Sequence, residues 1–259
     1  MKKVWYVTLL CFMSMFFNCS KDSLKQSKMG YFPKTIDLEY NTEQTVLYKL
    51  FYTTKNLLSQ INIERSSDGE NTRIVYDFQY NDQGLLKDVQ ITDETDNIPL
   101  KVSFAYDVNG IIDDIDFVSS GTEIETSIFY NSAVNSYTVD GEFGNLPTTW
   151  NFDSKNHLKD ININGNVFGL DLDEASKGVF YDVPMQPAHH ICSGLLFYLF
   201  SYELYYFSPS KIVKVITNEK PFLYQNNVRD DNGNLIFFQI NYSDEQFIGY
   251  NISYENRSL

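Results

Sequence analysis

The residue types best suited to metal binding or nucleophilic chemistry in this chain are His189, His190 and Cys192. His189 and Cys192 are three positions apart and would share one face of a helix, and imidazole and thiolate are both zinc ligands. A Cys–His pair can also act as a nucleophile, if the thiol is accessible and a third group orients the histidine. No second cluster supplies further ligands, and His157 is distant in the sequence. We therefore expect packed histidines beside a buried free thiol, with no metal and no cofactor.

Closely spaced carboxylates are the second chemical candidate, because glycoside hydrolases use a pair of them. Two groups are dense enough to supply such a pair: Asp113, Asp114 and Asp116, and Asp171, Asp173 and Glu174. In strands that alternate between apolar and polar residues, acids more often mark the solvated face. We expect that role here and no catalytic residues, so a glycan-acting hydrolase is the weakest of the functional hypotheses.

The segment RDDNGN, at 229–234, is similar in composition to a calcium-binding loop. An EF-hand loop with Gly233 at its sixth position needs an acid at position 228 and a glutamate at position 239. Those positions hold Val228 and Gln239. The segment is therefore predicted to be a turn.

Aromatic residues are unusually frequent, with 19 Tyr and 20 Phe among 259 residues. Exposed Tyr and Trp side chains stack on sugars and on apolar ligands. Our candidates for ligand binding are Trp150, Tyr202, Tyr205 and Tyr206. The alternative is that most aromatic residues fill the inner face of a sheet.

The elements that would position these residues follow a repeated pattern, in which an aromatic residue is followed four positions later by Gly or Asn and six positions later by Leu or Ile. The clear copies are Tyr52/Asn56/Leu58, Tyr80/Gly84/Leu86, Tyr106/Gly110/Ile112 and Phe152/Asn156/Leu158, and the partial copies begin at Tyr130, Arg229 and Tyr242. Apolar residues two positions apart precede each aromatic residue, which predicts a half-buried strand. Gly or Asn then supplies the positive φ of a turn, and a second strand leaves. The repeat predicts β-hairpins joined into an antiparallel up-and-down meander.

The outgoing strands carry apolar residues at positions +6, +9 and +11 from the aromatic residue. The step of three positions from +6 to +9 breaks the alternation, which has a period of two. One extra residue between them, a β-bulge, would place the apolar residues at +6 and +9 on the same face of the strand. We predict β-bulges at or near Lys87–Asp88, Asp113–Asp114 and Lys159–Asp160. Counting from Thr45, the chain contains about a dozen strands, and a sheet of that width curves strongly or closes as a barrel.

One segment interrupts the repeat. Between Pro187 and Pro209 the chain is apolar on every side at helical spacing, with Glu203 as its only acid. A helix of this kind must be buried all round. We predict a buried apolar helix near residues 188–207, within an insertion at about 174–222, packed on the concave side of the curved sheet. An apolar barrel interior accommodates such a helix, whereas the polar lumen of a porin does not.

The N-terminus carries Lys2 and Lys3 and then a 14-residue apolar run from Val4 to Phe17. Such a run is shorter than a membrane span and typical of a signal peptide. Cys19 follows it, and the stretch resembles a bacterial lipoprotein signal, which implies cleavage after residue 18 and acylation of Cys19. The sequence DSL at 22–24 is similar to an O-glycosylation site of Bacteroidetes lipoproteins, which implies modification of Ser23. The competing hypothesis is a Cys19–Cys192 disulfide after ordinary secretion.

The hairpins resemble the YD repeats of bacterial secreted and surface proteins, over most of residues 45–165 and 225–255. Together with the signal, the chain resembles Bacteroidetes outer-membrane or surface lipoproteins of unknown function with a porin-like β fold. This resemblance implies a mainly β fold and an outer-membrane location, at the cell surface or the periplasmic face. It supplies no catalytic residue.

The net charge of the chain limits the classes of partner that it can bind. Loss of residues 1–18 removes two lysines and no acids, which takes the net charge from −14 to −16. Such a surface repels nucleic acid. We expect a signal peptide at 1–18, a tether at 19–34 and a single β domain at 35–259. The expected function is a non-enzymatic binding module for a glycan, peptide or apolar ligand, anchored in the outer membrane through its lipid. The alternative is a structural or interaction subunit with an envelope protein partner.

Overall fold

The computed structural model describes residues 28–40, 44–67, 69–94, 99–141, 147–197, 208–218, 220–241 and 246–259. Within 147–197, side chains are described as far as residue 193. The chain divides into two compact units. The first comprises Met1–Met29 with Ser258–Leu259, and the second comprises Gly30–Arg257. In the first, the Leu259 N–H donates to the Lys28 carbonyl at 2.8 Å. The features below belong to the second unit.

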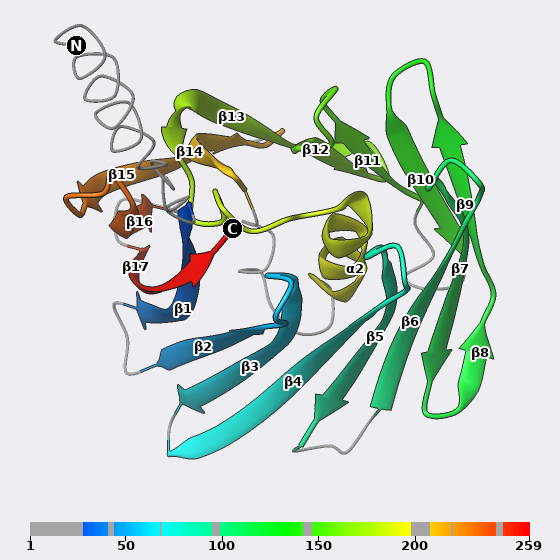
Figure 1. The fold of residues 1–259 in the computed structure, drawn as a ribbon, viewed down its shortest axis with the longest axis horizontal. Helices are drawn as coiled ribbons and strands as arrows, with labels where there is room; N and C mark the ends of the chain where they lie inside the picture. The colour runs from blue at the N-terminus through cyan, green and yellow to red at the C-terminus, as the bar shows by residue number, and fades with distance from the viewer. Residues whose placement is uncertain are drawn as a thin grey trace, which may run out of the picture. The chain divides into compact units, whose positions relative to one another are not determined.

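Seventeen strands and one helix make up the described secondary structure (Figure 1). Their bounds are β1 Met29–Tyr40, β2 Thr45–Tyr52, β3 Leu58–Ser67, β4 Glu70–Tyr80, β5 Leu86–Asp93, β6 Pro99–Tyr106, β7 Ile112–Ser119, β8 Thr122–Ile124, β9 Thr126–Asn131, β10 Ser136–Gly141, β11 Thr148–Phe152, β12 Leu158–Ile163, β13 Asn166–Lys177, α2 Pro187–Phe197, β14 Ser210–Ile216, β15 Phe222–Arg229, β16 Leu235–Asn241 and β17 Phe247–Ser258.

All seventeen strands belong to one antiparallel sheet. Strand β1 pairs with both β2 and β17, and β9 pairs with β10, so the sheet curls into a nearly closed barrel (Figure 1). The predicted mainly β, up-and-down barrel is confirmed. The strands outnumber the expected dozen because some of them, such as β1 and β13, do not carry the repeat.

The repeat forms hairpins whose turns have one geometry. In the 81–85 turn, the Asn81 side-chain oxygen accepts hydrogen bonds from the N–H groups of Gln83 and Leu85, both at 3.0 Å. Gly84 has φ +79°, and Asn56 and Asn156 have φ of 64° and 63° at the equivalent place. The predicted positive-φ role of Gly and Asn is confirmed. The same side-chain cap recurs at Thr53, Asp107, Asp153 and Asp230.

The predicted bulges are present. Tyr80 pairs with Leu86 while Gln79 pairs with Asp88, so Lys87 is the extra residue. The equivalent extra residues in the other hairpins are Ser59, Asp113, Lys159 and Ile236. Each bulge returns the following apolar residues to the buried face.

The tyrosines of the repeat also connect neighbouring hairpins. The Tyr80 hydroxyl donates to the Leu58 carbonyl at 2.7 Å, and the Tyr106 hydroxyl donates to the Leu86 carbonyl at 2.6 Å. In each pair the acceptor is the carbonyl of the residue that directly precedes the bulge in the preceding copy of the repeat. Tyr254 makes the same bond to Leu235 at 3.0 Å. The repeat thus fixes both the turn and the position of the next hairpin.

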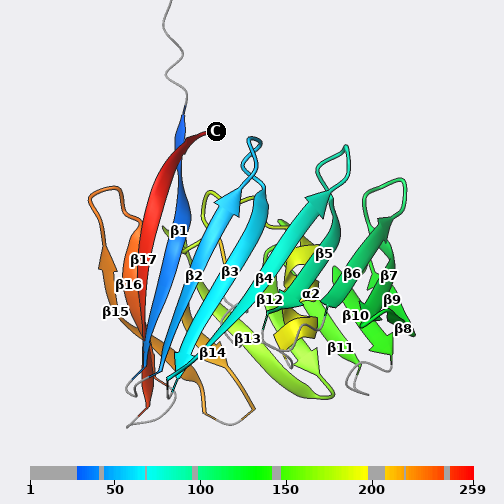
Figure 2. The same cartoon turned by 90° about the horizontal axis from the view of Figure 1, so that it is seen from below.

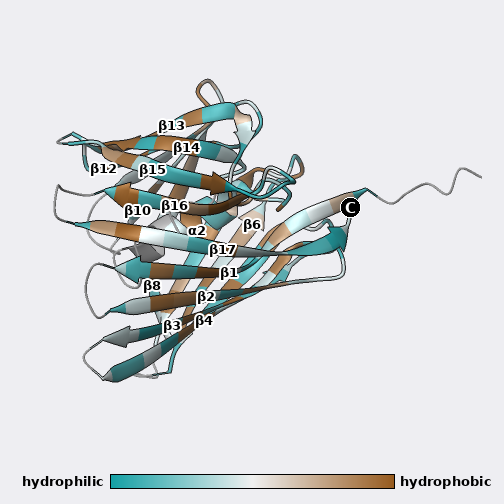
Figure 3. Ribbon diagram, turned by 90° about the vertical axis from the view of Figure 1, so that its left-hand side faces the viewer, coloured by the Kyte–Doolittle hydropathy of each residue, from teal (hydrophilic) through white to brown (hydrophobic). Residues whose placement is uncertain are grey.

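Alternation along the strands puts apolar side chains on one face and polar ones on the other. Figure 3 shows hydrophilic and hydrophobic residues following one another along the strands. The buried face forms one core that includes Ile61, Tyr76 and Trp150 from the wall and Ile191 from α2. The opposite face carries charged residues within strands, such as the pair Lys101 and Asp88, 3.0 Å apart. A transmembrane barrel has the reverse arrangement, with an apolar outer wall and a polar lumen.

Helix α2 lies within the ring of strands (Figures 1 and 2) and contacts β5, β11 and β12. The predicted helix is therefore present as far as Phe197, and residues 188–193 are buried, while positions 198–207 lie outside the described residues. The expected insertion at 174–222 is narrower, because β13 continues to Lys177 and β14 begins at Ser210. No described helix is long and apolar enough to cross a membrane.

Candidate binding site

His189 joins the helix to the wall of the barrel. Its Nδ1 accepts the Gln186 backbone N–H at 3.1 Å, so the neutral ring carries its proton on Nε2. Nε2 lies 2.9 Å from the Tyr80 hydroxyl, which itself donates to the Leu58 carbonyl. Burial lowers the pKa of His189 to about 4. His189 is therefore a neutral structural link and is poorly suited to proton transfer near neutral pH.

Gln186 completes this link. Its side-chain oxygen accepts the Leu86 N–H at 2.9 Å, and its side-chain nitrogen donates to the Gly84 carbonyl at 2.7 Å. The start of α2 is therefore held on the second hairpin of the repeat. This contact could not be predicted from the sequence, because Gln186 belongs to a loop between Pro184 and Pro187.

His190 and Cys192 are packed in the core, as expected. Both are nearly inaccessible to solvent, and His190 lies against the ring of Phe152. Burial, and then His189 and His157, lower the pKa of His190 to about 3. Burial raises the pKa of the Cys192 thiol, which opposes formation of the thiolate that a nucleophile or zinc ligand requires. Among the described residues, no group of three or more His, Cys, Asp or Glu side chains could hold a metal ion.

The acidic groups occupy solvated positions. Asp113, Asp114 and Asp116 are exposed on β7. Asp171 pairs with Lys214 at 3.4 Å. A hydrogen bond from Ser176 lowers the pKa of Asp173, whereas the general acid of a glycosidase needs a raised one. The 229–234 segment forms the predicted turn.

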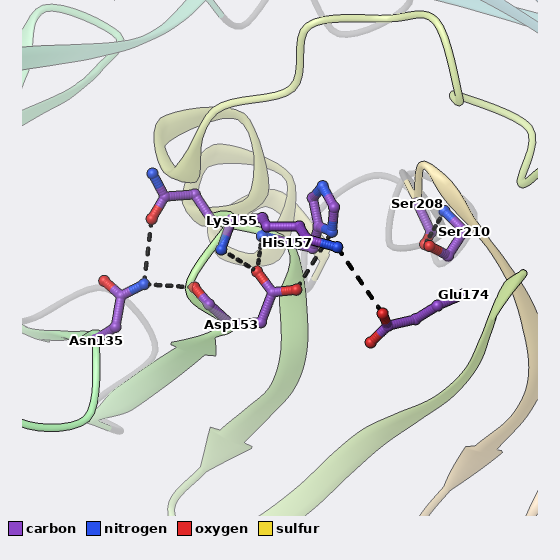
Figure 4. A network of polar contacts seen from close by, with 8 residues as sticks. Asn135, Asp153, Lys155, His157, Glu174, Ser208 and Ser210 are labelled. Carbon is purple, nitrogen blue, oxygen red and sulfur yellow. Dashed lines mark hydrogen bonds and ion pairs between the residues drawn. The ribbon is translucent and has the colours of Figure 1, made fainter.

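A polar network surrounds the 153–157 turn (Figure 4). The Asp153 carboxylate accepts the N–H groups of Lys155 and His157 at 2.7 and 2.9 Å, and its second oxygen lies 3.3 Å from His157 Nδ1. Asn135 donates to the Asp153 carbonyl at 2.7 Å. The Lys155 amine and Glu174 lie 3.9 Å apart at the edge of the network. These bonds stabilise the turn.

The predicted ligand-binding residues are not brought together among the described residues. Trp150 is fully buried on β11, between Tyr137 and Ile161 on its neighbours, so a ligand stacking on it would have to enter the barrel. Tyr202, Tyr205 and Tyr206 lie outside the described residues, as do Cys19 and Ser23.

The structure instead presents a groove that the sequence did not single out. It has a volume of about 660 Å³ and crosses β2, β3, β4 and the end of β5. Its lining residues are Thr45, Leu47, Glu64, Arg65, Ser66, Asn71, Thr72, Arg73 and Glu94. Pockets that bind small molecules typically measure about 300–1,000 Å³. The signal that could have found it is the row of polar residues on one face of three consecutive strands.

Two ion pairs organise the groove. Arg73 and Glu94 lie 3.0 Å apart, with side chains 44% and 49% exposed. Glu64 pairs with Lys49 at 2.6 Å, at the edge of the groove. Pairs this exposed contribute little to stability, so they can exchange a partner for a ligand at small cost.

Known proteins similar to this chain are found among solved structures. No protein-family model and no curated protein matches the chain. Twenty-three chains of solved structures match, among them a porin-like protein from Bacteroides uniformis ATCC 8492. That protein is 12% identical, with a TM-score of 0.49, and the match covers 85% of this chain and 98% of the other.

Proposed function

We propose that this chain is a lipid-anchored protein of the outer membrane that acts as a non-enzymatic binding module. The observation that carries the binding proposal is the groove across β2–β5. It is open to solvent, lined by side chains of several hydrogen-bonding types, and built on strands rather than on loops. Sites on strands are held more rigidly than sites on loops, and this lowers the entropy cost of binding.

The lipid anchor rests on the sequence. The apolar run followed by Cys19 resembles a lipoprotein signal, and Cys192, the other cysteine outside that run, is a buried free thiol. The hairpins, which resemble YD repeats, supply the scaffold. A barrel with a charged outer wall and a lipid at its N-terminus would lie against the membrane without inserting its strands.

Intact-mass spectrometry of the full-length protein, extracted gently from membranes, tests this proposal. We expect a denatured mass equal to residues 19–259 plus acyl chains, and a native spectrum with additional mass from a bound ligand. A different cleavage site without lipid would contradict the anchor. A lipidated protein that never carries added mass, even after incubation with extracts of cell-envelope and dietary polymers, would contradict the binding module.

One further observation favours the second candidate, an interaction subunit of an envelope complex. The outward side chains of Val167, Ile216, Leu223 and Phe247 are 37–47% exposed, on β13, β14, β15 and β17. Exposed apolar side chains gathered on one surface are typical of protein interfaces. Cross-linking in intact cells would support this role if Ile216→Asp abolished a specific adduct and Lys101→Asp, on another part of the wall, did not.

A further inference from the structure

We infer that the groove across β2–β5 binds an uncharged, hydroxyl-rich ligand, namely a neutral oligosaccharide. This inference rests on the proposed binding function and specifies its ligand. It is carried by the charge balance of the groove and the arrangement of its side chains.

The lining is electrically balanced in a strongly acidic chain. It contains Arg65, Arg73, Glu64 and Glu94, whose formal charges cancel, while the whole chain carries −14. A polyanion such as nucleic acid or an acidic glycan would be repelled by the chain and would meet only one uncompensated positive charge, that of Lys49 at the edge of the groove. A strongly basic peptide would find no excess of carboxylates there. The balance favours a neutral partner.

The side chains lie in two cross-strand rows. One row follows the pairs Leu47–Glu64 and Glu64–Arg73 and continues to Glu94, which meets Arg73 at 3.0 Å. The second follows the pairs Thr45–Ser66 and Ser66–Asn71. The first row offers planar guanidinium and carboxylate groups, and the second offers hydroxyl and amide groups.

This combination suits sugars. A guanidinium donates two parallel hydrogen bonds and a carboxylate accepts two, so each can bind two neighbouring hydroxyls of a sugar ring. Amide and hydroxyl side chains both donate and accept, as sugar hydroxyls do. Leu47 supplies an apolar surface for the C–H face of a ring.

The test is binding to an array of short neutral and acidic oligosaccharides derived from glucans, xylans, mannans and uronic-acid polymers, followed by calorimetric titration of the hits. Arg73→Met and Asn71→Ala are the test variants. Lys214→Met is the matched control, because Lys214 forms a comparable ion pair with Asp171 at 3.4 Å, with side chains 38% and 45% exposed, on β13 and β14. Thermal unfolding verifies that all three variants are folded.

We expect binding to at least one neutral oligosaccharide, weakened at least tenfold by Arg73→Met and by Asn71→Ala and unchanged by Lys214→Met. Binding that all three variants retain would overturn the assignment to the groove. Binding to acidic oligosaccharides alone, or to none, would overturn the ligand class. In those cases, added mass in the native spectrum would still support the binding function. The proposal on the ligand class can therefore fail while the proposal on the binding function stands.

Discussion

The repeat hairpins from β2 to β7 and the segment from β13 to β15 are built in contrasting ways. In the hairpins, each strand pairs with its neighbour over most of its length, and eight residue pairs join β2 to β3. Between β14 and β15 only two pairs form, Lys214–Leu223 and Val215–Phe222. The chain between β13 and β14 leaves the wall and contributes α2 to the interior.

The difference shows two ways of stabilising one barrel. The hairpins depend on short-range bonds that each copy repeats, namely the capped turn, the bulge and the tyrosine hydroxyl. The β13–β14 connection depends on long-range contacts made once, such as the bond between His189 and Tyr80 across 109 positions. Loss of one repeated bond leaves the other copies intact, whereas loss of a unique contact has no substitute. Substitutions should therefore cost more in the second region than in the first.

Acidification should produce the largest effect, through the two histidines of α2. An unfolded chain protonates histidine near pKa 6.5, whereas the folded values are about 4 for His189 and about 3 for His190. The unfolded state therefore gains protons first as pH falls, and the free energy of unfolding drops below about pH 6.5 until the folded pKa values are reached. Urea unfolding should give a free energy lower by about 4 kcal/mol at pH 5 than at pH 7, about 2 kcal/mol from each histidine.

His190→Leu isolates one of these contributions. In this variant, the difference in the free energy of unfolding between pH 7 and pH 5 should be about half as large, because one buried imidazole is gone. The carboxyl groups with lowered pKa values, such as Asp173, affect stability mainly below this window. An unchanged decrease in His190→Leu would show that His190 is not the group that titrates.

Gly178→Ala should be the most damaging single substitution. Gly178 follows β13, and its N–H donates to the Pro209 carbonyl at 2.9 Å. A Cβ at this position would collide with the backbone oxygens of Ser210 and Ser208, which cannot move independently of the strand. We expect a loss of about 3 kcal/mol in chemical unfolding. Gly169→Ala is the control, because its Cβ would meet Ile216 at an ordinary 3.7 Å, and equal losses in both variants would refute the explanation.

Tyr80→Phe tests the point where the two regions meet. Tyr80 belongs to the repeat, but its hydroxyl serves both the Leu58 carbonyl and His189. Tyr106 makes only the bond within the repeat, to Leu86. We expect a loss of about 2 kcal/mol for Tyr80→Phe and about 1 kcal/mol for Tyr106→Phe in urea unfolding. Equal losses would mean that the bond to His189 adds nothing.

The same contrast explains how much could be predicted from the sequence. The hairpins, positive-φ turns and bulges follow from spacing, because alternation has period 2 and one extra residue is needed to restore it. The partners of His189 and Gln186 could not be predicted, because they lie on a hairpin about a hundred positions away and depend on how the barrel closes. The groove was missed because Asn71 and Arg73, taken singly, look like ordinary solvent-facing strand residues. Trp150 was a candidate for ligand binding because the sequence does not show which face of β11 points into the barrel. In the structure, Trp150 lies on the inward face and is part of the core.

Asn81→Ala should have the smallest effect, and it tests whether the capped turn is an independent unit. The substitution removes the oxygen that accepts the N–H groups of Gln83 and Leu85, while the backbone bond from Gly84 N–H to the Asn81 carbonyl at 2.9 Å remains. We expect a loss of about 1 kcal/mol in urea unfolding. Asn81→Asp keeps the acceptor and should cost almost nothing, because the chain itself places aspartate at the equivalent positions 107, 153 and 230. If Asn81→Asp cost as much as Asn81→Ala, the Asn81 amide group would matter rather than its oxygen, and the turns would not be interchangeable copies of one design.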